Sequence, residues 1–205
     1  GPQHWGPART PFEVMVGAVL TQATAWRNVQ KAISNLERAG ALTPGAIRAL
    51  APPELARLVY PSGFFNAKSR KLKALCQYLG RAHDDDIEAM SRLKTTTLRG
   101  ELLGVFGIGE ETADAILLYA LGHPVFVIDA YSRRTFGRLG LANAFTSYTD
   151  HQTLFTRDLP HDAAMFGEYH ALIVRHGRVS CKKLPLCAGP AAGPDSDRRR
   201  ARMDL

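Results

Sequence analysis

The stretch Val-Phe-Gly-Ile-Gly-Glu-Glu-Thr-Ala at residues 105–113 decides how the middle of this chain folds. Gly107 and Gly109 bracket one apolar residue, and apolar positions then recur at helical spacing over residues 113–121. An apolar stretch precedes the glycines, so the passage predicts helix, hairpin, helix. The first turn of a helix carries unpaired N–H groups and the positive end of its dipole, so such a turn can bind a phosphate. Because glycines break many helices, the turn needs support from other residues.

A carboxylate supplies that support. Asp129 follows the apolar run Val125–Ile128, which predicts a short extended connection, and precedes residues 130–134, which can open another helix. In that place Asp129 can be a simple helix cap, worth about 1 kcal/mol. The same N–H groups and dipole favour the ionised form of the acid. A capping role and a catalytic role are therefore compatible.

Together these passages resemble the helix-hairpin-helix (HhH-GPD) DNA glycosylases of the endonuclease III superfamily. The resemblance begins at Pro11-Phe12-Glu13, includes Thr21-Gln22-Ala23-Thr24 and Gly63–Lys68, and ends near Gly177. Thr-Gln-x-Thr, Gly-x-Gly and Val-x-x-Asp in this order are far more specific than any one of them. The resemblance implies an all-α, two-domain fold with a cleft between the domains, and double-stranded DNA containing damaged bases as the partner.

Functional positions of the family carry over to this chain by the same resemblance. It implies that Asp129 assists cleavage of the glycosidic bond, that Gln22 fills the gap left by a flipped base, and that the hairpin amides hold a phosphate. Two arginines after Asp129 are predicted to contact phosphates, although a solvated helix face would give the same pattern. The predicted DNA-binding residues are Gln22, Gly107, Gly109, Arg133 and Arg134.

The hairpin departs from the family at two positions. Phe106 replaces the proline that usually precedes the first glycine, which changes the turn without abolishing it. Glu111 stands where members that also nick the strand carry a lysine. A lysine amine attacks the sugar and forms a Schiff base, which a carboxylate cannot do. The glutamate therefore predicts a monofunctional enzyme, although a solvated acid in a helix's first turn is an equally good reading of it.

The iron–sulfur members of the family end in four cysteines, which this chain cannot supply. It has three cysteines, of which Cys181 and Cys187 are separated by five residues and Cys76 lies far away among core leucines. No histidine pairs with cysteine or aspartate at metal-ligand spacing. We therefore expect no iron–sulfur cluster, no metal and no other cofactor, although the hairpin could hold a monovalent cation.

The same departures, with Gly63–Lys68, most resemble the 3-methyladenine DNA glycosylase III branch. There the substrates are alkylated bases and aromatic side chains form the pocket, and Trp26 and Trp5 stand at the matching places. A purine methylated on a ring nitrogen is cationic, and a cation stacked on tryptophan gains about 0.5–2 kcal/mol. Flipping the base out of the duplex costs a few kcal/mol, least when damage has weakened its pairing. We expect excision of an alkylated purine to leave an abasic site.

Charge and composition agree with a nucleic-acid partner. Lys and Arg number 26 against 19 Asp and Glu, a net charge of +7 that suits a polyanion. Basic residues cluster at 68–73 and at 133–138, where each group could neutralise phosphates or form a solvated face. No apolar run can span a bilayer, and the sparse cysteines suit a reducing compartment. We expect a soluble, monomeric protein with no membrane partner, either cytoplasmic and nucleoid-associated or otherwise intracellular.

The pattern of residues also predicts the domain organisation. Thr10–Glu13 is a capping box that opens a helix with a buried stripe, and Asn66 is expected to cap the basic helix. By resemblance, the hairpin lies in a six-helix domain and both chain ends form a second domain, followed by a flexible Gly-, Pro- and Arg-rich tail. The expected bounds are 21–133 for the first domain, 1–20 plus 134–187 for the second, and 188–205 for the tail.

Two alternatives remain open. One is a bifunctional glycosylase and lyase that uses an unaligned lysine, which borohydride trapping on abasic DNA would reveal. The other is a noncatalytic helix-hairpin-helix module that recognises DNA without chemistry. The presence of Asp129 and Gln22 counts against the module, and a failure to release free base from methylated DNA would favour it.

Overall fold

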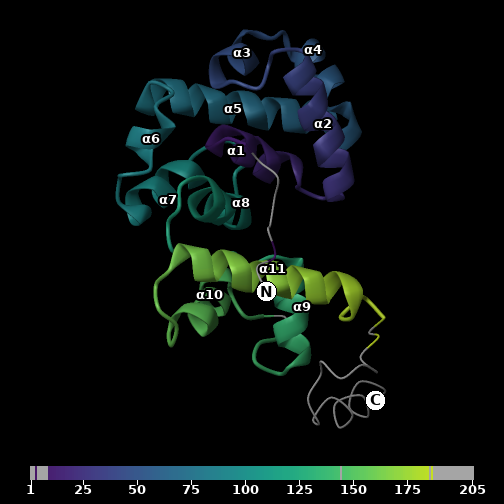
Figure 1. The fold of residues 1–205 in the computed structure, drawn as a ribbon, viewed down its shortest axis with the longest axis vertical. Helices are drawn as coiled ribbons and strands as arrows, with labels where there is room; N and C mark the ends of the chain where they lie inside the picture. Colours follow the sequence, from purple (N-terminus) through teal and green to yellow (C-terminus); the bar gives the residue numbers. More distant parts are fainter. Residues whose placement is uncertain (1–2, 4–8, 144, 185, 187–205) are drawn as a thin grey trace. The chain divides into compact units, whose positions relative to one another are not determined.

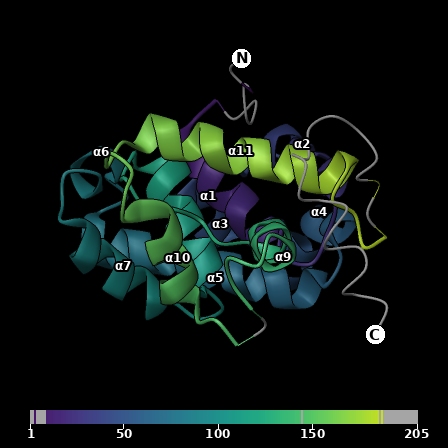
Figure 2. The ribbon, with the colours of Figure 1, turned by 90° about the horizontal axis from the view of Figure 1, so that it is seen from below.

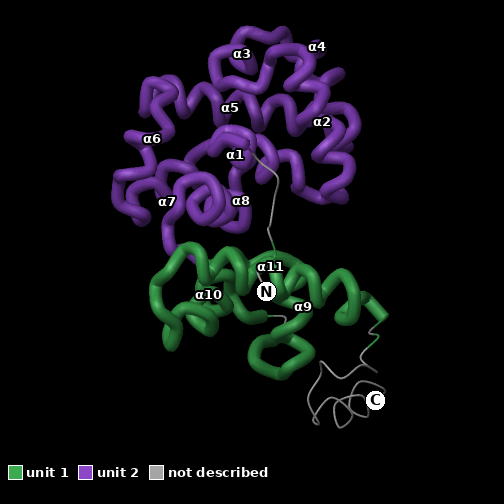
Figure 3. Tube along the Cα trace, viewed as in Figure 1, with its two compact units in different colours: residues 1–5, 126–205 green, residues 6–125 purple. Residues whose placement is uncertain are grey.

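The computed structural model describes residues 3, 9–143, 145–184 and 186, and these residues form helices and connecting loops without a strand (Figure 1). The all-α prediction is confirmed for this part of the chain. Two compact units divide the chain (Figure 3). We call residues 6–125 the hairpin unit and residues 1–5 with 126–205 the aspartate unit. Within the described ranges, no helix combines the length and apolar character needed to cross a membrane.

The hairpin unit is a bundle of helices around one apolar core. Helix α1 packs against α2, α5, α8 and η2, and this places it in the interior of the unit. The predicted stripe of Phe12, Val16, Val19 and Leu20 is buried, as expected. The elements are α1 (Pro11–Leu20), α2 (Trp26–Arg38), α3 (Pro44–Ala49), α4 (Pro52–Val59), η1 (Tyr60–Ser62), α5 (Phe65–His83), α6 (Ile87–Met90), α7 (Thr95–Leu103), α8 (Glu110–Ala115) and the π-helical turn η2 (Ile116–Ala120).

Two helix starts in this unit test the predictions from sequence. At α1, Thr10 Oγ1 accepts a hydrogen bond from Glu13 N at 3.1 Å, which confirms Thr10 as the predicted cap. At α5, the prediction that Asn66 is the cap is wrong, because the helix begins one residue earlier, at Phe65, without a side-chain cap. Phe64 precedes it in the left-handed region with φ of 45°, and this backbone conformation sets the start instead.

The boundaries between the units differ from the expected ones. Helix α1 was expected in the second domain, but its apolar face is part of the hairpin unit's core, so the chain enters that unit before α1. The chain leaves the unit after Val125, ahead of Asp129 rather than after Arg133. The expected tail at 188–205 lies outside the described residues.

The aspartate unit contains α9 (Ala130–Arg138), α10 (Tyr148–Thr156) and α11 (Ala163–Val179), and α9 packs against α11 (Figure 2). Its core is aromatic, with the Phe126 ring stacked on Phe155 at a centroid distance of 4.1 Å. The connection at residues 125–128 lies outside any helix and is tied to α10 by two hydrogen bonds. Gln152 Nε2 donates to Phe126 O at 2.7 Å, and Ile128 N donates to Tyr148 Oη at 3.2 Å. These contacts fix the backbone that leads into Asp129.

Candidate DNA-binding and catalytic site

The predicted helix-hairpin-helix is present, and its two glycines have different reasons to be glycine. Gly107 has φ of +81°, a conformation that side chains rarely adopt. A Cβ on Gly107 would also lie 2.7 Å from both Cδ and Cε of Lys71, whose stem crosses the turn. Gly109 has extended backbone, and a Cβ there would meet no other described atom within 4 Å. The turn therefore requires glycine at the first position far more than at the second.

A partly buried ion pair connects the two helices of the motif. Arg99 on α7 donates from Nε to Asp114 Oδ1 at 2.7 Å and from Nη2 to Oδ2 at 3.2 Å. Asp114 on α8 is completely buried. The forked geometry of two parallel hydrogen bonds fixes orientation as well as distance. The pair therefore fixes the angle at which the hairpin is presented, and sequence reasoning did not single out either residue.

Gln22 contacts the hairpin, which is the part of the chain expected to bind DNA. Its Nε2 donates to Gly107 O at 3.1 Å and to Thr112 Oγ1 at 3.0 Å. Its Oε1 accepts a hydrogen bond from the ammonium of Lys71. Both amide N–H groups of Gln22 are thus used, and one of its acceptor sites is occupied by a cation. The sequence reasoning placed Lys71 in a basic cluster but did not predict this contact.

Of the two tryptophans predicted to form the base pocket, the structure describes Trp26 but not Trp5. Trp26 begins α2 and is half-buried, and its ring lies so close to α1 that a Cβ on Gly17 would be 3.3 Å from it. Part of the ring is therefore used in packing, and its role in a base pocket stays a prediction. Trp5 lies outside the described residues. An aromatic that the sequence reasoning missed is Phe64, which is 72% exposed despite its strained left-handed backbone.

Glu111 is exposed in the first turn of α8, directly after Glu110. The place of the family lysine is therefore occupied by the second of two consecutive carboxylates. Glu110 Oε1 lies 3.6 Å from Arg99 Nη2, which offsets part of its charge. The hairpin accordingly carries local negative charge on the side where its second helix begins.

Asp129 caps α9, which confirms the predicted capping role. Its catalytic role stays a prediction. Its Oδ1 accepts from Ser132 N at 2.7 Å, and its Oδ2 lies 3.5 Å from His170 Nε2 on α11. The side chain is 13% exposed. Burial alone would raise the pKa of this carboxyl, but the neighbouring His170 and the Ser132 donors outweigh it and lower the pKa below its ordinary value. The result is a carboxylate that stays ionised in a largely desolvated place.

His170 is the functional candidate that sequence reasoning missed. Its position on a helix with an apolar stripe made a core or capping role the default, and the structure buries it. What gives it significance is the packing of α11 on α9, which brings its ring to Asp129. No local pattern in the sequence encodes that contact, because it depends on tertiary packing.

The arginines that follow Asp129 hold other parts of the aspartate unit. Arg133 Nη1 donates to Thr146 O at 3.2 Å. Arg134 donates to Cys181 O at 2.7 Å and to Gly177 O at 2.9 Å. These guanidinium groups thus fix the loop before α10 and the end of α11. Contact of Arg133 and Arg134 with phosphates stays a prediction.

The residues present do not fit an iron–sulfur cluster. Cys76 is buried on α5 of the hairpin unit, and burial raises the pKa of its thiol to about 12, whereas cluster ligands are thiolates. Cys181 is a separate buried thiol in the aspartate unit, and Cys187 lies outside the described residues. In the part of the chain that the structure describes, no three His, Cys, Asp or Glu side chains are grouped to hold a metal ion. The monovalent cation at the hairpin stays a prediction.

The fold and these features define a helix-hairpin-helix protein of the DNA repair class. Residues 16–160 match the HhH-GPD superfamily of base excision DNA repair proteins. The chain belongs to this family, and it is a base excision repair DNA glycosylase of the HhH-GPD superfamily.

Individual relatives agree with this assignment. The chain is 43% identical over 188 residues to a Methanocaldococcus jannaschii protein provisionally named a DNA repair glycosylase, MJ1434, covering 91% of this chain and 86% of the relative. Its fold is similar to that of the H. pylori 3-methyladenine DNA glycosylase MagIII bound to 1,N6-ethenoadenine, with a TM-score of 0.72, 29% identity and coverage of 85% of this chain and 87% of that chain. A non-covalent endonuclease III–DNA complex has the same fold, with a TM-score of 0.77, 24% identity and coverage of 97% and 88%.

Proposed function

We propose that this protein is a monofunctional DNA glycosylase that hydrolyses the N-glycosidic bond of an alkylated purine in double-stranded DNA and leaves an abasic site. The observation that carries the proposal is Asp129, a desolvated carboxylate with a lowered pKa in a chain of this family. The similarity to the H. pylori 3-methyladenine glycosylase supports an alkylated base as the substrate.

Asp129 supplies the charge that the reaction needs. When the bond from C1′ to the base nitrogen breaks, its electrons leave with the cationic base, which becomes neutral, and the sugar develops positive charge. An ionised carboxylate beside that sugar stabilises it, as in glycoside hydrolysis. Water then adds to C1′ and gives up a proton. His170 acts as a positioning residue, because it favours the ionised form of Asp129 from Oδ2 while the Ser132 N–H donates to Oδ1.

The hairpin unit binds and distorts the DNA in this proposal. The turn at Gly107 contacts a phosphate, Gln22 enters the duplex, and Trp26 stacks on the flipped base. Stacking by Trp5 stays a prediction from the resemblance. A cationic base leaves its sugar readily, so the enzyme must select and position it more than protonate it.

The absence of strand cleavage is proposed from Glu111. Its carboxylate cannot form a Schiff base with the sugar aldehyde of an abasic site, whereas a lysine amine can. The Lys71 amine contacts Gln22, so a lyase that uses Lys71 is the alternative to test. Borohydride trapping on abasic DNA should give no covalent complex with the wild type.

The test is to incubate the protein with methylated duplex DNA and to measure released bases by chromatography. The wild type should release an alkylated purine, and Asp129→Asn should lose this activity by at least about 100-fold while it binds DNA with unchanged affinity. Full activity of Asp129→Asn would remove Asp129 from the mechanism. Binding without release of any base across a panel of lesions would instead favour the noncatalytic module, and a trapped covalent complex would favour the lyase.

A further inference from the structure

Two carboxylates at the hairpin would repel a bound phosphate. Its second helix, α8, is only six residues long and opens with Glu110 and Glu111. Two carboxylates within a few ångströms of a bound phosphate repel it, and they lie well inside the distance of about 10 Å over which salt screens charges. Backbone donors at the turn would have to overcome that repulsion. A cation held beside the turn would remove the difficulty.

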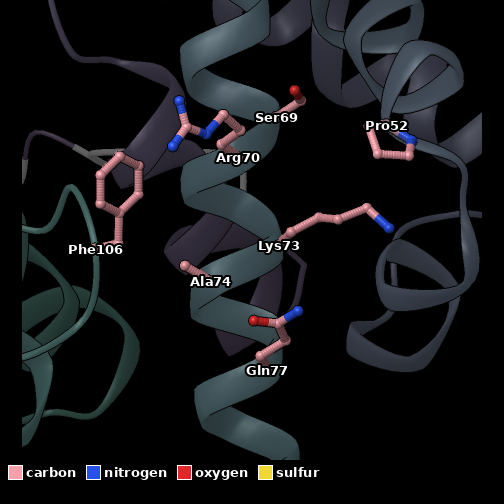
Figure 4. Close-up of a pocket in the computed structure, with 7 residues that line it drawn as sticks. All are labelled: Pro52, Ser69, Arg70, Lys73, Ala74, Gln77 and Phe106. Atoms are coloured by element: carbon pink, nitrogen blue, oxygen red, sulfur yellow. The ribbon is translucent and has the colours of Figure 1, made fainter.

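Helix α5 passes beside the hairpin. Its four clustered cations, Lys68, Arg70, Lys71 and Lys73, have different surroundings. Lys68 is 2% exposed, and its ammonium donates to two backbone carbonyls inside the hairpin unit. Lys73 also donates to backbone carbonyls, and Figure 4 shows its side chain directed away from Phe106. The two cations that reach the hairpin are therefore Arg70 and Lys71.

Arg70 is held against the hairpin by an aromatic ring. Its guanidinium carbon lies 5.0 Å from the centroid of Phe106, and Figure 4 shows the two groups side by side. Arg70 is exposed, and no described residue accepts a hydrogen bond from its guanidinium. Phe106, the residue directly before Gly107, is 56% exposed. The ring thus orients a charged group that donates to none of the described residues. Beside it lies a hollow of about 250 Å³ lined by Pro52, Ser69, Arg70, Lys73, Ala74, Gln77 and Phe106.

Lys71 approaches the same turn from the next position on α5. Its stem covers Gly107, and its ammonium donates to Gln22 Oε1. Consecutive residues of one helix therefore place a guanidinium on Phe106 and an ammonium across Gly107. Their two positive charges add to that of Arg99 against the carboxylates of Glu110 and Glu111.

We propose that Arg70 and Lys71 are the cationic half of the hairpin's phosphate site, and that Phe106 serves as the platform that aims Arg70 at the DNA backbone. The inference rests on the proposed function only in that the hairpin holds DNA. Arginine presents its donors in a planar fork that matches a phosphate, and it stacks on aromatic faces, so an exposed Arg70 on Phe106 combines both uses. The proline that usually precedes the glycine offers no aromatic face for this purpose.

The test measures how DNA binding depends on salt. A plot of log affinity against log salt has a negative slope, and each phosphate contact that is lost reduces the magnitude of this slope by about 0.9. Fluorescence anisotropy with a duplex that contains a tetrahydrofuran abasic-site analogue gives this slope for the wild type, Arg70→Gln and Arg81→Gln. Arg81 is an exposed arginine in the last turn of the same helix, so Arg81→Gln is the matched control for charge.

We expect Arg70→Gln to lower the slope by about 1 and to weaken binding equally to damaged and undamaged duplexes. The loss of affinity should shrink about 3.5-fold between about 50 and 200 mM salt, because the wild type makes one more counterion-releasing contact than the variant and its affinity falls more steeply with salt. Arg81→Gln should match the wild type. Equal slopes for Arg70→Gln and the wild type would overturn the role of Arg70.

Further variants separate the platform from the charge. Phe106→Leu should weaken binding less than Arg70→Gln does, and it should have no added effect in an Arg70→Gln background. Lys71→Gln should lower the slope by about 1 as well. Additive effects of the Phe106 and Arg70 changes would refute the platform, and an unchanged slope for Lys71→Gln would refute its share of the site. Circular dichroism melts check that each variant is folded.

The design keeps this inference apart from the proposed function. If the wild type binds DNA but releases no base, the proposed activity fails while the salt slopes still test Arg70 and Lys71. If the wild type releases base and the slopes of Arg70→Gln and Lys71→Gln equal its own, the composite phosphate site fails and the activity stands.

Discussion

Replacing Gly107 with alanine should be far more harmful than replacing Gly109, although the two glycines are equivalent in the Gly-x-Gly pattern. At Gly107 an alanine must adopt φ of +81°, which costs about 1–2 kcal/mol. Its Cβ would also overlap the Lys71 stem, so Lys71 must leave the turn and give up its hydrogen bond to Gln22. A hydrogen bond to a charged group contributes about 1.5–3 kcal/mol, less where water reaches it.

The sum of these effects predicts that Gly107→Ala lowers the free energy of unfolding by about 2–4 kcal/mol. Gly109→Ala should lower it by less than about 1 kcal/mol, because the backbone there is extended and only the weaker capping of alanine counts. Urea unfolding followed by circular dichroism measures both values. DNA affinity should fall for Gly107→Ala and change little for Gly109→Ala.

A Lys71→Ala background isolates the steric part. With the stem removed, Gly107→Ala should cost only the backbone strain of about 1–2 kcal/mol. An undiminished cost in that background would show that Lys71 does not lie over the turn as described. Equal costs for the two glycine substitutions would refute the argument as a whole.

Other predictions concern single groups. His170 lowers the pKa of Asp129 against the opposing effect of burial, so His170→Gln should raise that pKa. The acid limb of the pH profile of kcat/KM should then move to higher pH, and an unmoved limb would contradict the positioning role of His170. Phe64→Gly should raise the melting temperature by about 2–4 °C, because it relieves left-handed strain at a side chain that is 72% exposed, and a lower melting temperature would contradict this. Burial lowers the pKa of Lys68 from 10.5 to about 8, so between these pH values the unfolded chain binds more protons than the folded one. The free energy of unfolding of the wild type should therefore rise with pH by about 1 kcal/mol per unit relative to that of Lys68→Met. Parallel unfolding free energies of these two proteins from pH 8 to 10 would refute the shift.

The features that could be predicted from sequence are those set by neighbours in the chain. Thr10 as a cap, the glycine turn before α8 and Asp129 as a cap all depend on contacts within a few residues. Such contacts leave a mark on residue type and spacing. The predicted cap at Asn66 was wrong because Phe64 adopts a conformation that residue type disfavours, and only the surrounding packing can hold it there.

The features that could not be predicted depend on contacts between helices. Lys71 reaches Gln22 across 49 residues, and Arg99 reaches Asp114 across 15. Helical spacing places Lys68 on the apolar face of α5, but the sequence does not show which of the other cations reaches the hairpin, because that depends on how α5 packs against α1 and the hairpin. Charge clustering in a sequence shows that cations are near one another, and only the fold shows which of them face a partner.

The contacts of Gln22 set a cost for the insertion that we propose. To enter a duplex as proposed, Gln22 must release Gly107 O, Thr112 Oγ1 and the Lys71 ammonium. The two neutral hydrogen bonds contribute about 0.5–1.5 kcal/mol each, and the charged one contributes more. A phosphate that attracts Lys71 weakens the charged bond and lowers this barrier, but the cost of flipping the base is added to it. This release cost is the same at damaged and intact sites, so it lowers insertion of Gln22 at both. The preference for damaged DNA comes from the flipping cost, which is least where damage has weakened pairing.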